Sequence, residues 1–152
     1  MSFDIDAARA LIENAVKEFL KEDKNRAHLK RGRVERTCAT DLATKLTPLF
    51  ESDIISVDSP YNRHHNATKY LADKVIELDI AIHERGNDEN NLVALELETN
   101  NRPKCDDVWK LEGLTQPLGG YGYKLGLFLV FGIEDKSGEL LAMDWFVDGT
   151  KV

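Results

Sequence analysis

The chain has 152 residues, of which 42% are hydrophobic and 31% are charged, and 20 basic against 27 acidic side chains give a formal net charge of −7. This composition excludes a disordered chain, and no apolar run approaches the ~20 residues that a membrane helix needs. The acidic balance also argues against a nucleic-acid binder, because such proteins usually carry a basic surface. The length fits a single domain over residues 1–152.

Cellular location is constrained by the N-terminal sequence and by the cysteines. The first residues lack a basic region followed by an apolar one, so no secretory signal is expected. The two cysteines, Cys38 and Cys105, are far apart in the sequence and form no metal-type pair. We therefore expect a cytoplasmic protein with reduced thiols and no membrane association.

The first third of the chain predicts two helices joined by a basic connection. Apolar residues recur at three- and four-residue steps over residues 5–22, which is typical of an amphipathic helix. A second stripe predicts a helix over residues 34–47, with Pro48 helping to stop it. The connection is either a solvated loop or an anion-facing patch. In the second case nucleic acid would be a partner, bound through Lys30, Arg31 and Arg33.

The rest of the chain predicts five strands and one more helix. Residues 54–62 have strand character, and the alternating segments 77–83 and 91–98 predict an antiparallel hairpin with a long polar loop. A helix from about 103 to 118 should follow. The nearly continuous apolar run over 124–133 predicts a strand buried on both faces, and 139–147 predicts a final strand. This order predicts a three-layer α/β fold, a mixed sheet flanked by helices.

The hairpin carries a candidate site rich in carboxylates. A register symmetric about the loop predicts three facing pairs: Asp79–Glu96, Glu77–Glu98 and His83–Leu92. The four acids would then crowd one face of the hairpin. Facing like charges are destabilising, so solvent on an open sheet face, raised pKa values, a nearby cation or a metal must compensate. Carboxylate oxygens are natural ligands of Mg²⁺ or Mn²⁺.

Several stretches of the chain carry a resemblance to a known superfamily. They are residues 34–37 (VERT), 61–63 (YNR), 78–86 (LDIAIHERG), 91–98 (NLVALELE) and 121–126 (YGYKLG). Together they resemble the PD-(D/E)XK nuclease superfamily, and within it a family of small bacterial proteins. The resemblance implies the restriction-endonuclease-like αβββαβ core, with an extra N-terminal helix here. It also implies metal-dependent hydrolysis of phosphodiester bonds in DNA or RNA.

The resemblance assigns roles to individual residues. Asp79 and Glu96 match the two acids of the motif, and Glu35 matches the acid often found on the first core helix. Asp79, Glu96 and the Leu97 carbonyl would hold one Mg²⁺ or Mn²⁺, which lowers the pKa of a bound water. Glu35 would complete the metal shell or orient a water. Its alternative role is a surface salt bridge or a helix-start acid.

One position departs from the superfamily pattern. Where the motif has a Lys two residues after the second acid, this chain has Glu98, and an ionised Glu would repel the phosphate. Three outcomes stay open. Glu98 is a third metal ligand or a general base; or Lys110 or Lys124 supplies the charge; or the site is inactive and the fold serves as a nucleic-acid or protein binding module. Lys110 also fits a solvated helix face, and a homodimer is compatible with each outcome.

Overall fold

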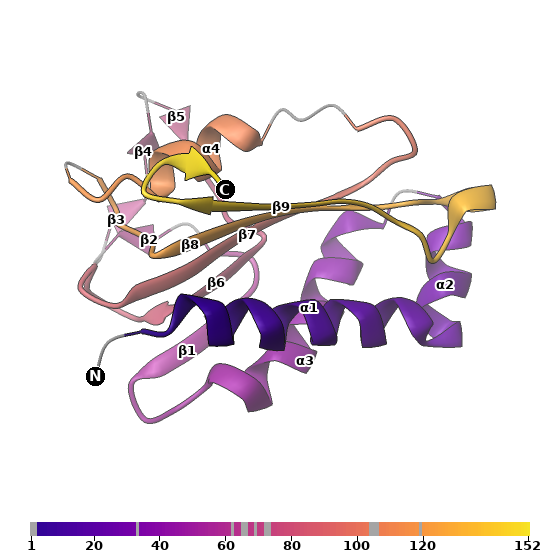
Figure 1. Cartoon of the computed structure of the whole chain (residues 1–152), viewed down its shortest axis with the longest axis horizontal. Coiled ribbons are helices and arrows are strands. Elements are labelled where there is room, and N and C mark those ends of the chain that lie inside the picture. The colour runs from indigo at the N-terminus through magenta and orange to yellow at the C-terminus, as the bar shows by residue number, and fades with distance from the viewer. Residues whose placement is uncertain are drawn as a thin grey trace.

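A mixed six-stranded sheet is the centre of the fold. The computed structural model describes residues 3–32, 34–61, 63–64, 67–68, 70–71, 74–103, 107–118 and 120–152. The strand order is β1-β6-β7-β8-β9-β10, and helices pack against both faces of the sheet (Figure 1). The predicted α/β class, a mixed sheet flanked by helices, is therefore confirmed.

The bounds of the elements are as follows. The helices in the described residues are α1 (Ile5–Lys21), α2 (Asp23–Lys30), α3 (Glu35–Phe50) and α4 (Val108–Leu114), with a 3₁₀ turn, η1 (Glu134–Lys136). The sheet comprises β1 (Ile55–Asp58), β6 (Ile80–Glu84), β7 (Asn91–Thr99), β8 (Leu125–Phe131), β9 (Leu140–Val147) and β10 (Thr150–Lys151). Two small separate pairs are β2 (Arg63–His64) with β3 (Ala67–Thr68), and β4 (Tyr70–Leu71) with β5 (Lys74–Val75). None of the described helices is long and apolar enough to span a bilayer.

The N-terminal helix forms as its apolar periodicity predicts. The Asp4 side chain caps α1 by accepting a hydrogen bond from the Ala7 amide at 3.0 Å, which satisfies one of the free N–H groups at a helix start. The stripe containing Ile12, Val16 and Phe19 is buried against the sheet. α1 therefore covers one face of the sheet together with α3.

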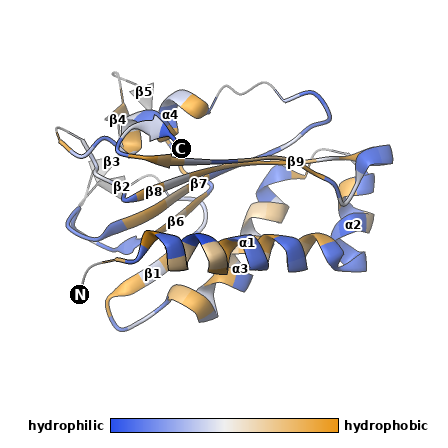
Figure 2. Cartoon of the chain, viewed as in Figure 1, coloured by the Kyte–Doolittle hydropathy of each residue, from blue (hydrophilic) through white to orange (hydrophobic). Residues whose placement is uncertain are grey.

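The basic connection is a helix and not the predicted loop. α2 is hydrophilic along almost its whole length (Figure 2), and only Asn25 and Leu29 are buried in it. Two inward positions among eight residues make no stripe that periodicity can detect. Lys30 ends α2 and Arg31 caps it, both exposed, whereas Arg33 lies outside the described residues.

The second predicted helix is longer than expected. α3 runs to Phe50, so Pro48 lies inside its last turn and does not stop it. Pro48 lacks the N–H that would bond to the Thr44 carbonyl, and the helix ends two residues later, at Phe50.

The hairpin between β6 and β7 is confirmed, with one irregularity. Ile80 faces Leu95, Ala81 faces Ala94 and Ile82 faces Val93, in the register symmetric about the loop that the sequence predicts. A bulge follows, so His83 faces Asn91, and the predicted partner Leu92 is wrong. The extra residue in β7 shifts the register from that point onward.

The first hairpin strand begins later than predicted. β6 starts at Ile80, and Leu78 instead forms an isolated bridge with Tyr61. Glu77 therefore lies outside the β6–β7 ladder, and its predicted pairing with Glu98 is wrong. The strand predicted over 54–62 is also shorter, since β1 covers only Ile55–Asp58 and residue 62 lies outside the described part.

The C-terminal half contains the buried strand that the sequence predicts. All seven residues of β8 are buried, between parallel β7 and antiparallel β9. The helix predicted over 103–118 is wrong at both ends, because α4 covers only Val108–Leu114 and residues 104–106 lie outside the described part. At its C-terminal end Pro117 disfavours helical backbone in the residue before it.

Two apolar clusters fill the two sides of the sheet. The larger lies under α1 and α3, where the rings of Phe19 and Phe131 stack with centroids 5.5 Å apart. The smaller lies under α4 and includes Leu111 and Phe128. Since side chains alternate along a strand, residues 96 and 98 of β7 face α4, whereas residues 95 and 97 face the larger cluster.

Candidate functional site

Asp79 lies at the bend just before β6, between two other segments. Its Oδ2 accepts a hydrogen bond from the Leu97 amide at 2.7 Å. Its backbone carbonyl accepts one from the Ser59 hydroxyl at 2.6 Å. These two contacts fix the carboxyl group of Asp79 against β7 and its main chain against the segment that follows β1.

Glu96 lies in the middle of β7 and is almost fully buried, with 2% of its surface exposed. Its carboxyl group shares a hydrogen bond with the carboxyl group of Asp79. The other oxygen, Oε1, is buried and has no hydrogen-bond partner among the described residues. The structure thus brings together the two acids that the sequence pairs, and it leaves one carboxyl oxygen unsatisfied.

The environment raises the pKa of both acids. Burial, followed by the neighbouring Asp79, raises the pKa of Glu96 well above its usual value, although Lys110 acts in the opposite direction. Burial also raises the pKa of Asp79, against the hydrogen bonds from Leu97 and Glu96 that lower it. Two adjacent carboxyl groups with raised pKa values, one buried and one half-buried, hold a proton between them more readily than they hold two negative charges.

A cation from α4 stands beside this pair. Lys110 Nζ lies 4.0 Å from Glu96 Oε1 and 2.9 Å from Asp107 Oδ1. Burial lowers the pKa of Lys110, but the charges of Glu96 and Asp107 outweigh it and raise the pKa overall. Lys110 is only 20% exposed, so the alternative of a solvated helix face does not describe it.

Asp107 is a further residue of the site, which no pattern in the sequence predicted. It precedes α4 by one residue and pairs with Lys110 three positions later. The spacing Asp-x-x-Lys is a common helix-surface pair, so the available signal was weak.

The other candidate lysine is not part of the site. The Lys124 amide donates to the Asn91 carbonyl at 3.0 Å, which places Lys124 at the start of β7. Glu96 lies toward the other end of that strand. Of the two lysines proposed to replace the motif Lys, only Lys110 lies beside the acids.

Glu35 and Glu98 border the pair at the end of β7. Glu35 Oε1 accepts a hydrogen bond from the Thr99 amide at 3.2 Å, and the Val34 amide donates to the Thr99 hydroxyl at 3.2 Å. Glu35 is exposed as a residue, but partial desolvation of its carboxyl group raises its pKa. Glu98 is largely buried on the α4 side. The start of α3 is thereby joined to the end of β7 next to the paired acids.

A small pocket opens beside Asp79. Its volume is about 170 Å³, and it is lined by Glu35, Arg36, Ala39, Ser59, Pro60, Glu77 and Asp79. Glu77, which the sequence placed opposite Glu98, instead pairs with Arg36. The pocket exposes Asp79 and Glu35 to solvent on the α3 side.

The donor atoms fit a divalent cation only as a two-carboxylate site. Among the described residues no group of three His, Cys, Asp or Glu side chains is arranged to hold a metal ion. Asp79 and Glu96 form a pair, and Leu97 turns its amide toward Asp79. Because the amide and carbonyl of one strand residue point to the same side, the Leu97 carbonyl points to the same edge of β7 as its amide. Mg²⁺ is commonly bound by one or two carboxylates with water and substrate oxygens, which this donor set allows.

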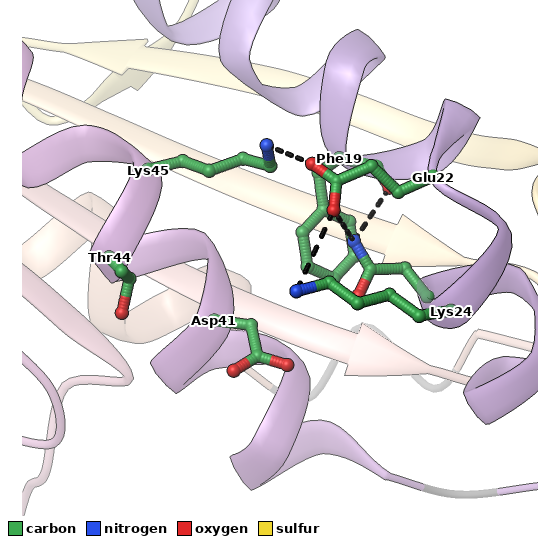
Figure 3. Close-up of a pocket in the computed structure, with 7 residues that line it drawn as sticks. Phe19, Glu22, Lys24, Asp41, Thr44 and Lys45 are labelled. Carbon is green, nitrogen blue, oxygen red and sulfur yellow. Dashed lines mark hydrogen bonds and ion pairs between the residues drawn. The ribbon is translucent and has the colours of Figure 1, made fainter.

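A second cavity, of about 200 Å³, lies among the N-terminal helices (Figure 3). Glu22 lines this cavity and pairs with Lys45 of α3 and, at 3.9 Å, with Lys24. The buried Asn25 donates to the Phe19 carbonyl at 2.9 Å. These charges satisfy one another and hold the α1–α2 junction on α3, so we assign this cavity a structural role.

Comparisons with known proteins leave the family of this chain open. No family model, no curated protein and no solved structure matches it. The class that the structure itself defines is a mixed α/β sheet protein in which a carboxyl pair, with one member buried in the central strand β7, lies beside a lysine.

Proposed function

We propose that this chain is a metal-dependent nuclease-like protein that hydrolyses phosphodiester bonds in DNA or RNA, with the restriction-endonuclease-like fold that the sequence resemblance implies. One observation carries the proposal. Lys110 Nζ lies 4.0 Å from the buried Glu96, which shares a hydrogen bond with Asp79. A positive charge thus stands beside the two acids, although the motif position itself holds Glu98.

The roles of the residues follow from their positions. Asp79, Glu96 and the Leu97 carbonyl would hold Mg²⁺ or Mn²⁺. The metal, when bound, would activate a water and neutralise charge on a phosphate oxygen. Lys110 places its ammonium group where negative charge would develop on the phosphate. Asp107 positions Lys110 through its 2.9 Å contact, and Glu35, which faces the pocket, orients a water.

Exposed cations lie close to the site in the sequence. α2 ends at Lys30 and is followed by Arg31, and both are exposed. Only a few residues separate them from Glu35, which contacts the end of β7. The proposal assigns these two cations, with Arg33, to the nucleic-acid backbone, whose phosphates attract Lys and Arg without regard to sequence.

A second candidate function is favoured by one specific observation. Glu98 replaces the motif Lys, and no three-ligand group for a metal lies in the described part of the chain. A nuclease fold without catalysis, which binds nucleic acid or protein, would carry these features. The two candidates differ in one property, namely whether Asp79, Glu96 and Lys110 support turnover.

A cleavage assay separates the two candidates. Labelled single-stranded and duplex oligonucleotides and a supercoiled plasmid are incubated with Mg²⁺ or Mn²⁺ and three chains: wild type, Asp79→Ala/Glu96→Ala, and Lys110→Met. We expect cleavage by the wild type only, with Lys110→Met slower by about two to three orders of magnitude, as for loss of one electrostatic stabiliser. Equal cleavage by wild type and the double variant, or none by either, rejects the enzyme.

A free cysteine bears on the cellular location of the protein. Cys38 is free and buried, and burial raises the pKa of its thiol to about 12. A buried neutral thiol agrees with the reducing cytoplasm, which we propose as the location.

Assembly as a homodimer stays a prediction, which light scattering of the purified chain tests.

A further inference from the structure

Arg36 has a position that the proposed mechanism does not use. It lies in the first turn of α3, directly after Glu35, and it lines the pocket beside Asp79. Its side chain is 79% exposed, and among the described residues it pairs with Glu77, with Nη2 and Oε1 3.5 Å apart. Among the described residues that line this pocket, Arg36 is the one cation.

The contact with Glu77 holds Arg36 only loosely. Both side chains are exposed, Glu77 by 48%, and exposed ion pairs contribute little to stability. A guanidinium group forms shorter and stronger bonds when it binds a phosphate through two parallel N–H groups. A carboxylate and a phosphate present similar pairs of anionic oxygens. Glu77 therefore occupies the Arg36 guanidinium group that would otherwise bind a phosphate.

The pocket has room for such a group and lies where the chain of a substrate would pass. A volume of about 170 Å³ equals roughly five to six water molecules at ~30 Å³ each. The pocket reaches Asp79, whose carboxyl group belongs to the proposed catalytic pair. A phosphate bound by Arg36 would therefore neighbour the phosphate bound at that pair.

We propose that Arg36 binds a backbone phosphate of the nucleic-acid substrate next to the scissile one, and that Glu77 holds the Arg36 side chain when no substrate is bound. This inference rests on the proposed nuclease function. It assigns Arg36 a substrate-binding role and Glu77 the role of a competitor for the same guanidinium group.

Equilibrium binding of a fluorescent oligonucleotide, followed by anisotropy over a series of salt concentrations, tests the inference. The metal is removed with a chelator, so that no cleavage occurs, and the series is repeated with Ca²⁺. The chains are wild type, Arg36→Gln, Glu77→Gln and the double variant. Arg9→Gln is the matched control, because Arg9 lies over the Trp145 ring of β9 and neither residue lines the pocket.

Loss of one phosphate contact predicts a defined change. Arg36→Gln should weaken binding several-fold and reduce the slope of log K against log salt by about 0.9 on duplex or 0.7 on single strands. Glu77→Gln should strengthen binding several-fold in the wild-type background. It should have no effect in the Arg36→Gln background, because there is then no guanidinium group to release. Arg9→Gln should leave the slope unchanged.

Three results would overturn the inference. The first is an Arg36→Gln chain with the wild-type affinity and slope. The second is a slope lost equally in Arg9→Gln, which indicates an effect of net charge alone. The third is a Glu77→Gln effect that persists without Arg36. If the wild type binds and cleaves nucleic acid but Arg36→Gln is unchanged, only this inference fails. If the wild type neither binds nor cleaves, the proposed function fails with it.

Discussion

Replacing Glu96 by Gln should stabilise the protein increasingly as the pH rises. Glu96 is 2% exposed, and burial and the neighbouring Asp79 raise its pKa well above the usual value. The folded chain therefore keeps a proton on this carboxyl group at pH values where the unfolded chain has lost it. Glutamine has the same shape and no charge, so it removes this titration while keeping a hydrogen bond to Asp79.

The sign and size follow from proton linkage. Between the ordinary Glu pKa of ~4.3 and the raised folded value, the native state binds more protons than the unfolded state. The wild-type free energy of unfolding then falls as the pH rises, by up to about 1.4 kcal/mol per pH unit for one group. The free energy of unfolding of Glu96→Gln does not fall in this way, because glutamine does not titrate. Its stability relative to wild type should rise at that rate until the pH reaches the folded pKa, and then level off.

Urea denaturation of both chains at a series of pH values from 5 to 8 measures this difference. Glu84→Gln is the control, because hydrogen bonds from Asn90 and Asn87 lower the pKa of Glu84. Its contribution to stability is present above the unfolded pKa and is lost only as the pH falls. A difference between Glu96→Gln and wild type that does not change with pH would refute the claim that burial keeps this carboxyl group protonated.

Three further predictions concern the support and the chemistry of the site. Thr99→Val removes the hydroxyl that accepts from the Val34 amide and should cost about 1–2 kcal/mol in thermal or urea unfolding, whereas Thr99→Ser should restore stability. Gly132→Ala should destabilise by about 1–3 kcal/mol, because an added Cβ would lie 2.3 Å from the Lys136 carbonyl oxygen; an unchanged melting temperature would contradict this. Glu98→Lys supplies the charge that the superfamily motif contains, so metal-dependent cleavage should rise. A fall in cleavage would show instead that Glu98 itself takes part.

The sequence predicted well those features that depend on local pattern. The apolar run over 124–133 predicted a strand buried on both faces, and β8 is buried along its whole length. The symmetric loop predicted the register of Ile80–Ile82 against β7, and hence the meeting of Asp79 with Glu96. In both cases the side-chain alternation of a strand carries the information.

The remaining features depend on contacts between distant segments. α2 has too few inward residues for a stripe, although Leu29 is fully buried. The bulge at His83 breaks a register that symmetry alone would continue. The proximity of Lys110 to Glu96 depends on how α4 packs on β7, and no spacing in the sequence predicts that packing.

Binding of Mn²⁺, followed by its electron paramagnetic resonance signal, tests most directly the central claim that the Asp79–Glu96 pair holds a catalytic divalent cation. We predict that the wild-type chain binds one Mn²⁺ and that Asp79→Ala/Glu96→Ala loses this ion. Glu77→Gln, on the rim of the pocket, should keep it. Equal Mn²⁺ binding by the wild type and the double variant, or no binding by the wild type, would contradict the account.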